Sequence, residues 1–351
     1  MRIWQKPRLI LRQCGKQPVT PIPCFINGST GSAFFLSDFS NEVHNSVNVV
    51  TGAFGYIGRY IARYLLDLRE QVKTVTTHPD KPNPFGNAVE AFPYNFDRPD
   101  RLIASLRGAS TLYNTYWIRF EYGGATFQQA VQNTVTLFDC AKKAGIKKIV
   151  HISVTHASVE SRLPYYNGKG LQERALIDSG VPYSIVRPTL VFGKEDILIN
   201  NIAWLIRKFP VFPISGAGQY LVQPVYVGDL AAIAVACAKD PDSRVLDAIG
   251  PETFTFKEFV KLIALKLKPS VKLVEVPPAI GIALGQVIGR AVGDVVLTKD
   301  ELRGLMAGML TSTQVPNGTT RFSQWLELNK DALGTAYSSE LGRHFRWRRS
   351  A

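Results

Sequence analysis

Tyr165 and Lys169, four residues apart, are the pair in this sequence whose types and spacing best suit proton transfer. They lie at the start of a predicted helix, where residues four apart share a face. An ammonium group beside a phenol stabilises the phenolate and lowers a pKa of about 10, so the hydroxyl can donate and accept protons near neutral pH. Thirteen tyrosines would give this spacing about once by chance, so the interpretation also depends on where the pair lies.

Three glycines in the segment VVTGAFGYIG, residues 49–58, indicate a phosphate site. An apolar strand pattern precedes them, and an amphipathic helix pattern follows from Ile57. Gly52 allows a tight turn, Gly55 lets the backbone approach a phosphate, and Gly58 lets the helix pack closely on the strand. The N–H groups at the helix start would then bind a dinucleotide diphosphate. The alternative is an ordinary glycine-rich turn. The other residues of this turn that we place at the site are Phe54, Tyr56 and Ile57.

Strand-like and helical segments alternate from Val47 onward, which predicts an α/β fold with a doubly wound parallel sheet of the Rossmann type. After the strand that ends in the glycine turn, the predicted strands are Gln71–Thr76, Ala91–Phe96, Ser110–Thr115, Lys148–Ser153 and Tyr183–Arg187. The predicted helices are 56–68, 124–144 and 165–179. Because the carboxyl ends of parallel strands meet at one edge, Tyr165 and Lys169 would lie at the same edge as the glycines.

The pattern loosens after Pro188, which predicts a smaller, mostly helical C-terminal substrate lobe. We expect an N-terminal extension at 1–46, a dinucleotide-binding domain at 47–249 with a lobe insertion at about 190–224, the lobe at 250–335 and a basic tail at 336–351. Val225–Ala238 would return to the main domain. The extension is basic, with no acidic residue before Asp38, and resembles an organelle transit peptide; the alternative is an unstructured leader without an address. The chain would accordingly be organellar, in a mitochondrion or plastid, or else cytoplasmic.

Composition favours a folded protein, with 46% hydrophobic and 20% charged residues. The net charge of +13 is dispersed, so we expect an anionic cofactor or a weak membrane attraction and no specific nucleic-acid partner. The four cysteines form no C-x-x-C pair and the five histidines have no metal-ligand spacing, which predicts no metal site and no disulfide framework. No apolar run is long enough for a membrane span; the nearest, Pro277–Leu297, carries Gln286, Arg290 and Asp294.

Glycines recur every four residues at 281, 285, 289 and 293 and would form a smooth stripe on one helix. Each costs about 1 kcal/mol of helix propensity, which close packing would offset. The packing partner is either a neighbouring helix of the same lobe, which we favour, or a subunit or membrane surface contacted through 279–297.

Four motifs together resemble the short-chain dehydrogenase/reductase superfamily: TGAFGYIG, the Y-x-x-x-K of Tyr165 and Lys169, RPT at 187–189 and QPVYVGDL at 223–230. The closest likeness is to its extended and atypical branch, the NAD-dependent epimerase/dehydratase-like proteins. HIS at 151–153 and VFGKEDILIN at 191–200 look most like the group of the NAD(P)H-binding accessory subunit of mitochondrial complex I. The resemblance covers about residues 47–265.

The resemblance implies that Gly52, Gly55 and Gly58 hold the pyrophosphate and that Asp97 borders the adenine. It makes Tyr165 the acid/base, assisted by Lys169, which also holds the nicotinamide ribose; the segment after Pro188 would pass the nicotinamide. One departure is Val154, which stands where active members usually place a serine or threonine. Ser153 and Thr155 flank it and either substitute for that residue or only cap the strand end.

Thr76, Thr77 and His78 end the second strand, where an acidic residue would bind the ribose 2′-hydroxyl of NAD. With Lys81 close by, we lean to NADP(H) over NAD. Two functions follow: hydride transfer between a nicotinamide cofactor and an unidentified hydroxyl or carbonyl substrate, as in an oxidoreductase or epimerase, or a non-catalytic NAD(P)H-binding structural or assembly subunit of a respiratory complex.

Overall fold

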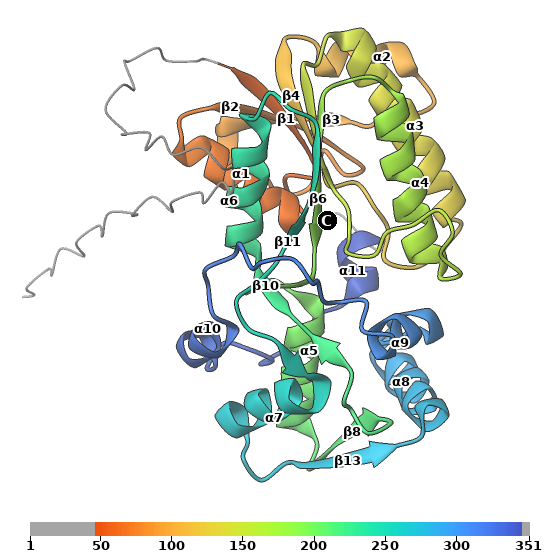
Figure 1. Ribbon diagram of the computed structural model, residues 1–351, viewed down its shortest axis with the longest axis vertical. Helices are drawn as coiled ribbons and strands as arrows, with labels where there is room; N and C mark the ends of the chain where they lie inside the picture. Colours follow the sequence, from red (N-terminus) through yellow and green to blue (C-terminus); the bar gives the residue numbers. More distant parts are fainter. Residues whose placement is uncertain (1–45, 346–351) are drawn as a thin grey trace, which may run out of the picture. The chain divides into compact units, whose positions relative to one another are not determined.

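The computed structural model describes residues 46–345 (Figure 1). The predicted leader therefore lies outside the described residues apart from Ser46, as do Cys14, Cys24 and the end of the basic tail.

Seven parallel strands form one sheet in the order β11-β6-β5-β4-β1-β2-β3 (Figure 1). The strands are β1 (Val47–Thr51), β2 (Gln71–Thr76), β3 (Val89–Pro93), β4 (Ala109–Asn114), β5 (Lys148–Ile152), β6 (Tyr183–Pro188) and β11 (Arg244–Ala248). Since β1 pairs with both β2 and β4, the chain winds in opposite directions from β1. A ligand crevice is expected at the carboxyl end of such a switch point.

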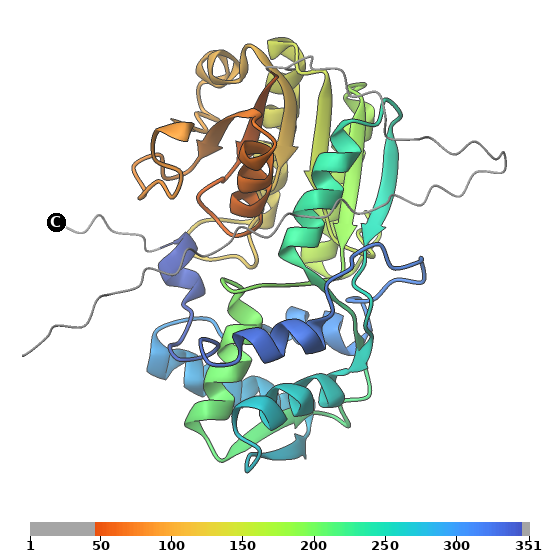
Figure 2. The same ribbon diagram turned by 90° about the vertical axis from the view of Figure 1, so that its left-hand side faces the viewer.

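Helices cover both faces of this sheet, which confirms the doubly wound prediction (Figure 2). The helices are α1 (Ile57–Asp67), α2 (Pro99–Leu106), α3 (Phe127–Ala144), α4 (Pro164–Asp178) and α6 (Val227–Ala238), with a short 3-10 turn η1 (Gly86–Ala88). On one face α1 and α6 bury Ile61 and Leu230 against Val50. On the other face α2, α3 and α4 bury Leu102, Leu137 and Leu176 against the sheet.

The six strands expected from the sequence are present, but the seventh, β11, was not predicted. Its sequence, RVLDA, carries two charges in five residues, and only Ala248 is buried, because the strand forms the edge of the sheet beside β6. The short apolar signal of a buried strand is therefore missing there.

A second hydrophobic core holds the smaller, mostly helical lobe together. Its helices are α5 (Ile197–Lys208), α7 (Phe256–Leu267), α8 (Pro278–Val292), α9 (Lys299–Met306) and α10 (Phe322–Asn329), followed by α11 (Glu340–His344). Its short strands are β7 (Leu190–Phe192), β8 (Val211–Ser215), β9 (Leu221–Val222), β10 (Pro224–Tyr226), β12 (Phe254–Thr255) and β13 (Lys272–Val276). Phe192, Phe259 and Phe322 are fully buried at the centre of this core.

The glycine stripe of α8 faces the lobe itself, although its neighbours are a strand and a loop and not the helix we favoured. A Cβ on Gly281 would lie 2.2 Å from the Ser215 hydroxyl, and one on Gly289 would lie 2.6 Å from the Asp294 carbonyl oxygen. Gly293 ends the helix at φ 65°. The stripe therefore allows close packing within the lobe.

Within residues 46–345, no helix combines the length and apolar character that a bilayer crossing requires. In the same range, no cluster of three or more histidine, cysteine or carboxylate side chains is arranged to bind a metal ion.

Candidate functional site

The turn between β1 and α1 has the geometry that a phosphate cradle needs. Gly52 has φ 62°, which favours glycine, and its N–H donates to the Val75 carbonyl at 2.9 Å. A Cβ on Gly58 would lie 2.5 Å from the Gly52 carbonyl oxygen, and one on Gly55 would lie 3.1 Å from it. Glycine at 58 therefore lets α1 approach the turn, and its N-terminus faces the sheet edge.

Nothing in the first turn of α1 opposes an anion there. The helix has no acidic residue in its first turn, and Tyr56 at the N-cap makes no side-chain cap. Arg59 lies in that turn, and its guanidinium donates to the Phe54 carbonyl at 3.1 Å. The ring of Phe54 is buried in the core, so this residue contributes its backbone to the turn. The turn fits a diphosphate by its open backbone, its free N–H groups and its charge.

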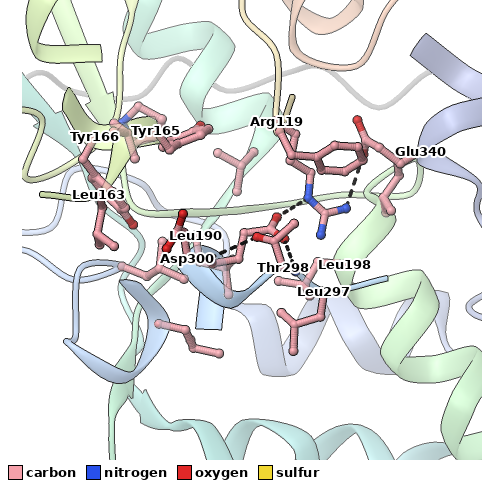
Figure 3. Close-up of a pocket in the computed structure, with 18 of the residues that line it drawn as sticks. Arg119, Leu163, Tyr165, Tyr166, Leu190, Leu198, Leu297, Thr298, Asp300 and Glu340 are labelled. Carbon is pink, nitrogen blue, oxygen red and sulfur yellow. Dashed lines mark hydrogen bonds and ion pairs between the residues drawn. The ribbon is translucent and has the colours of Figure 1, made fainter. Parts of the chain in front are cut away.

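A cavity of about 570 Å³ lies where this edge of the sheet meets the lobe (Figure 3). The predicted site residues that line it are Tyr56, Ile57, Ser153, Tyr165 and Pro188. Val154 also lines it and presents an apolar side chain to the cavity.

His78 and Asp97 lie outside this cavity, along the same sheet edge, because they follow β2 and β3. The His78 N–H donates to the Thr76 hydroxyl at 3.3 Å. The Asp97 side chain is 77% exposed and pairs with Arg98 at 3.5 Å. The adenosine half of a dinucleotide that ran along the edge from α1 would pass these residues.

In this structure the Lys169 side chain contacts the backbone and an aromatic ring. Lys169 is 2% exposed, and its ammonium donates to the Ile152 carbonyl at 2.9 Å. Burial lowers the pKa of Lys169 to about 7, although Glu173 opposes that shift. Burial, followed by Tyr166 and Glu301, raises the pKa of Tyr165 above its ordinary value.

The indole of Trp117 lies against both Lys169 and Tyr165. The Lys169 ammonium lies 5.0 Å from the centre of the Trp117 ring, and the Tyr165 ring meets the edge of the same indole at 5.9 Å. A Cβ on Gly168 would lie 2.5 Å from the indole, so only glycine leaves room for it. Phe127 stacks on Trp117 at 5.5 Å. The indole therefore contacts both members of the pair at once.

Ser153 and Thr155 already have protein acceptors for their hydroxyl hydrogens. Ser153 donates to Glu173 at 2.5 Å, and Glu173 also pairs with Arg187. Thr155 donates to the Met309 carbonyl at 2.9 Å. Neither hydroxyl has a hydrogen left to donate to a substrate oxygen in the cavity.

The rest of the cavity is lined mainly by leucines and by one ion-paired arginine, Arg119 (Figure 3). Arg119 pairs with Glu301 and, at 3.4 Å, with Glu340, and it donates to the Val296 carbonyl at 3.2 Å. The leucines are Leu163, Leu190, Leu198, Leu297, Leu305 and Leu310.

Trp117 and Arg119 were not among the residues expected at the site. They follow β4 directly, in the segment TYWIRF. Their position at the carboxyl end of a strand beside β1 is a signal that could have found them. Arg343 also lines the cavity, and no local pattern at the C-terminus marks it.

A family model described as NAD(P)H-binding matches residues 52–198, which run from the glycine turn through Tyr165 to the start of α5. Residues 52–198 form an NAD(P)H-binding domain. The prediction of a nicotinamide dinucleotide cofactor is thereby confirmed.

Two curated relatives carry the same name, "NADH dehydrogenase [ubiquinone] 1 alpha subcomplex subunit 9, mitochondrial". The protein from Arabidopsis thaliana is 27% identical over 249 residues, which cover 68% of this chain and 62% of the relative. The protein from Rattus norvegicus is 23% identical and covers 79% of this chain and 76% of the relative. The chain thus spans about three fifths of the Arabidopsis protein. The resemblance to the complex I subunit group is confirmed.

Among solved structures, the NADP(H) complex of triphenylmethane reductase from Citrobacter sp. aligns with a TM-score of 0.66 at 19% identity. It covers 82% of this chain and all of that chain. Nucleoside-diphosphate-sugar epimerases align as well. These likenesses confirm the extended short-chain dehydrogenase/reductase fold of the NAD(P)H-binding domain and its lobe.

Proposed function

We propose that this chain is a subunit of a mitochondrial respiratory complex in which bound NAD(P)H stabilises the fold and no hydride transfer occurs. The observation that carries this proposal is the position of Lys169. Its ammonium is hydrogen-bonded to the Ile152 carbonyl and lies over the ring of Trp117, so these groups and not a ligand hold it. Val154 supports the same proposal, because a valine side chain cannot donate a hydrogen bond to a substrate oxygen.

The names of the two curated relatives support a place in complex I, and both are mitochondrial. The basic leader expected from the sequence agrees with import into that organelle.

Gly52, Gly55 and the first turn of α1 would hold the diphosphate, and Pro188 would lie beside the nicotinamide. When bound to an active member of this fold, the coenzyme supplies hydride chemistry at its nicotinamide. We propose NADP(H) over NAD, because no carboxylate follows β2 to bind a 2′-hydroxyl. The cations Arg59 and Lys81 lie nearby instead and favour a 2′-phosphate.

The surface of α8 supports a subunit contact. Its glycines face the lobe, and the opposite side exposes Ile280, Leu284 and Val287 at 48%, 38% and 60%. Residues at this spacing form one apolar stripe of a helix. We propose that this stripe binds another subunit of the complex.

The experiment compares wild-type protein with Tyr165→Phe. Each is loaded with NADPH and mixed with a panel of quinones, aldehydes and nucleotide sugars while NADPH fluorescence is recorded. We expect no oxidation in either protein and equal NADPH affinity. Tyr166→Phe is the matched control, because Tyr166 is the adjacent phenol. Oxidation that Tyr165→Phe abolishes and Tyr166→Phe preserves would contradict the proposal.

The cavity favours a second candidate, a reductase for an uncharged apolar carbonyl compound such as a quinone. Six leucines line it, and Arg119 is paired with two carboxylates, so Arg119 is not free to bind a sugar diphosphate. The same panel tests this candidate, which predicts oxidation by quinones and none by nucleotide sugars.

A further inference from the structure

The C-terminal helix α11 shares the cavity with the start of α1. Arg343 and Glu340 line the cavity together with Tyr56 and Ile57, the N-cap and first residue of α1. Residues nearly 290 positions apart in the chain thus meet where the glycine turn presents its N–H groups.

The lobe holds α11 firmly. The Asp294 carboxylate accepts the N–H groups of Glu340 at 2.7 Å and Leu341 at 3.0 Å, and it is 9% exposed. Just before the helix, Ser338 exchanges two hydrogen bonds with the Asn201 amide, at 2.8 Å and 3.0 Å.

The other side of α11 contacts the loops that follow β2 and β4. The Lys81 ammonium donates to the Arg343 carbonyl at 3.4 Å, and the Phe345 ring stacks against Phe120 at 6.0 Å. Because β1 lies between β2 and β4 in the sheet, a segment that contacts both loops passes in front of the glycine turn. Figure 1 shows α11 below the carboxyl edge of the strands, on the side of the lobe.

The charges at this crossing favour an anion. Arg343 donates to the backbone carbonyl oxygen of Glu195 at 2.6 Å. This acceptor is neutral and does not cancel the positive charge of Arg343. Burial, followed by repulsion from Arg343 and Arg59, lowers the pKa of Lys81. Among the acids here, Glu195 accepts from Tyr60 at 2.7 Å and lies 3.8 Å from Arg59. Burial raises the pKa of Asp196 and of Glu340, and the charge of Arg343 opposes both shifts. The phosphates of a bound coenzyme would relieve the repulsion among the three cations.

We propose that α11 is a clasp over the coenzyme diphosphate and that Arg343 supplies a cation to it. The proposal rests on the coenzyme binding of the proposed function and is independent of whether hydride is transferred. It assigns a ligand contact to the C-terminus of the chain, outside the segment that carries the dinucleotide motif.

The test measures NADPH affinity and dissociation rate by stopped-flow fluorescence for the full chain and for Arg343→Ala. We expect about a tenfold loss of affinity, mainly through faster dissociation, since one charge-assisted hydrogen bond is removed. Arg290→Ala, an exposed arginine on α8, is the control and should match wild type.

Two further probes identify the group that Arg343 contacts. ADP-ribose contains the diphosphate and should lose the same factor in Arg343→Ala, whereas adenosine 2′-monophosphate lacks it and should bind equally to both proteins. A chain that ends at residue 339 removes the clasp entirely and should release NADPH at least as fast as Arg343→Ala.

Affinity within twofold of wild type in Arg343→Ala, or tighter binding, would overturn the clasp while the proposed function stands. An equal loss for adenosine 2′-monophosphate would overturn the diphosphate assignment. No binding of NADPH by folded wild-type protein would contradict the proposed function, and the clasp with it.

Discussion

Gly58 controls how closely α1 can approach the turn that precedes it. The nearest atoms to an added Cβ are backbone atoms of Gly52, at 2.5 and 2.8 Å, and they cannot move as the end of a side chain can. A methyl group there must shift the helix or the turn, and either shift moves the N–H groups that the diphosphate needs.

We predict that Gly58→Ala lowers the free energy of unfolding by about 1–3 kcal/mol and abolishes the stabilisation by NADPH. The measurement is thermal unfolding with and without NADPH. Gly285→Ala is the control, because its Cβ would meet only Leu297 at an ordinary 3.5 Å. A Gly58→Ala protein that NADPH stabilises as much as wild type would show that the diphosphate lies elsewhere.

Lys169 places an ammonium group in the protein interior, and its pKa of about 7 links its charge to stability. Below pH 7 both the folded and the unfolded chain carry the proton, and the folded chain bears the full cost of burying it. Between about pH 7 and 10.5 the unfolded chain binds more protons, so the stability of the wild type rises with pH.

We predict that the stability advantage of Lys169→Met over wild type is greatest below pH 7 and decreases by about 2 kcal/mol between pH 7 and 9. Urea unfolding across this pH range measures it. Lys261→Met, an exposed site on α7, should show a constant difference from wild type. A constant difference for Lys169→Met would mean that Lys169 keeps its ordinary pKa.

At the scale of elements, Arg119 joins three parts of the chain. It lies in the loop after β4 and pairs with Glu301 of α9 and Glu340 of α11. Glu340 is 8% exposed in its side chain, and burial raises its pKa although Arg119 opposes that shift. The arginine therefore offsets the charge of the buried Glu340 carboxylate and joins α11 to α9 through Glu301.

We predict that Arg119→Met destabilises the protein by about 1–3 kcal/mol at pH 7, less than a fully buried pair would because Arg119 is 24% exposed. The loss should shrink near pH 4, because burial raises the pKa of Glu340 and that carboxylate is then protonated. Chemical unfolding at both pH values measures it, with Arg303→Met as an exposed control expected within about 0.5 kcal/mol of wild type. An equal loss at both pH values would mean that packing and not charge is responsible.

The exposed stripe of α8 gives a prediction for the assembly. Val287→Lys should leave the melting temperature unchanged but prevent the chain from co-migrating with a large complex on native gels of its own mitochondria. Leu328→Lys on α10, which is 85% exposed, is the control. Co-migration of the Val287→Lys protein with the complex would show that α8 is not the subunit contact.

At the scale of the whole molecule, the sheet was predictable because its central strands are buried on both faces and stand between helices with clear periodicity. β11 was not, because an edge strand with two charges lacks that signal. The glycine turn was predictable from local sequence, since its chemistry lies within ten residues. The partners of Lys169 and Arg343 were not predictable from local sequence, because Trp117 and Lys81 contact them from distant parts of the chain.

We propose that one dinucleotide is bound at the start of α1 and remains reduced there. The most direct test is native mass spectrometry of the full chain after incubation with NADPH and a quinone. We predict one coenzyme per chain, with the mass of the reduced form after prolonged incubation. A folded chain that retains no coenzyme, or one that carries the oxidised form only when quinone is present, would contradict it.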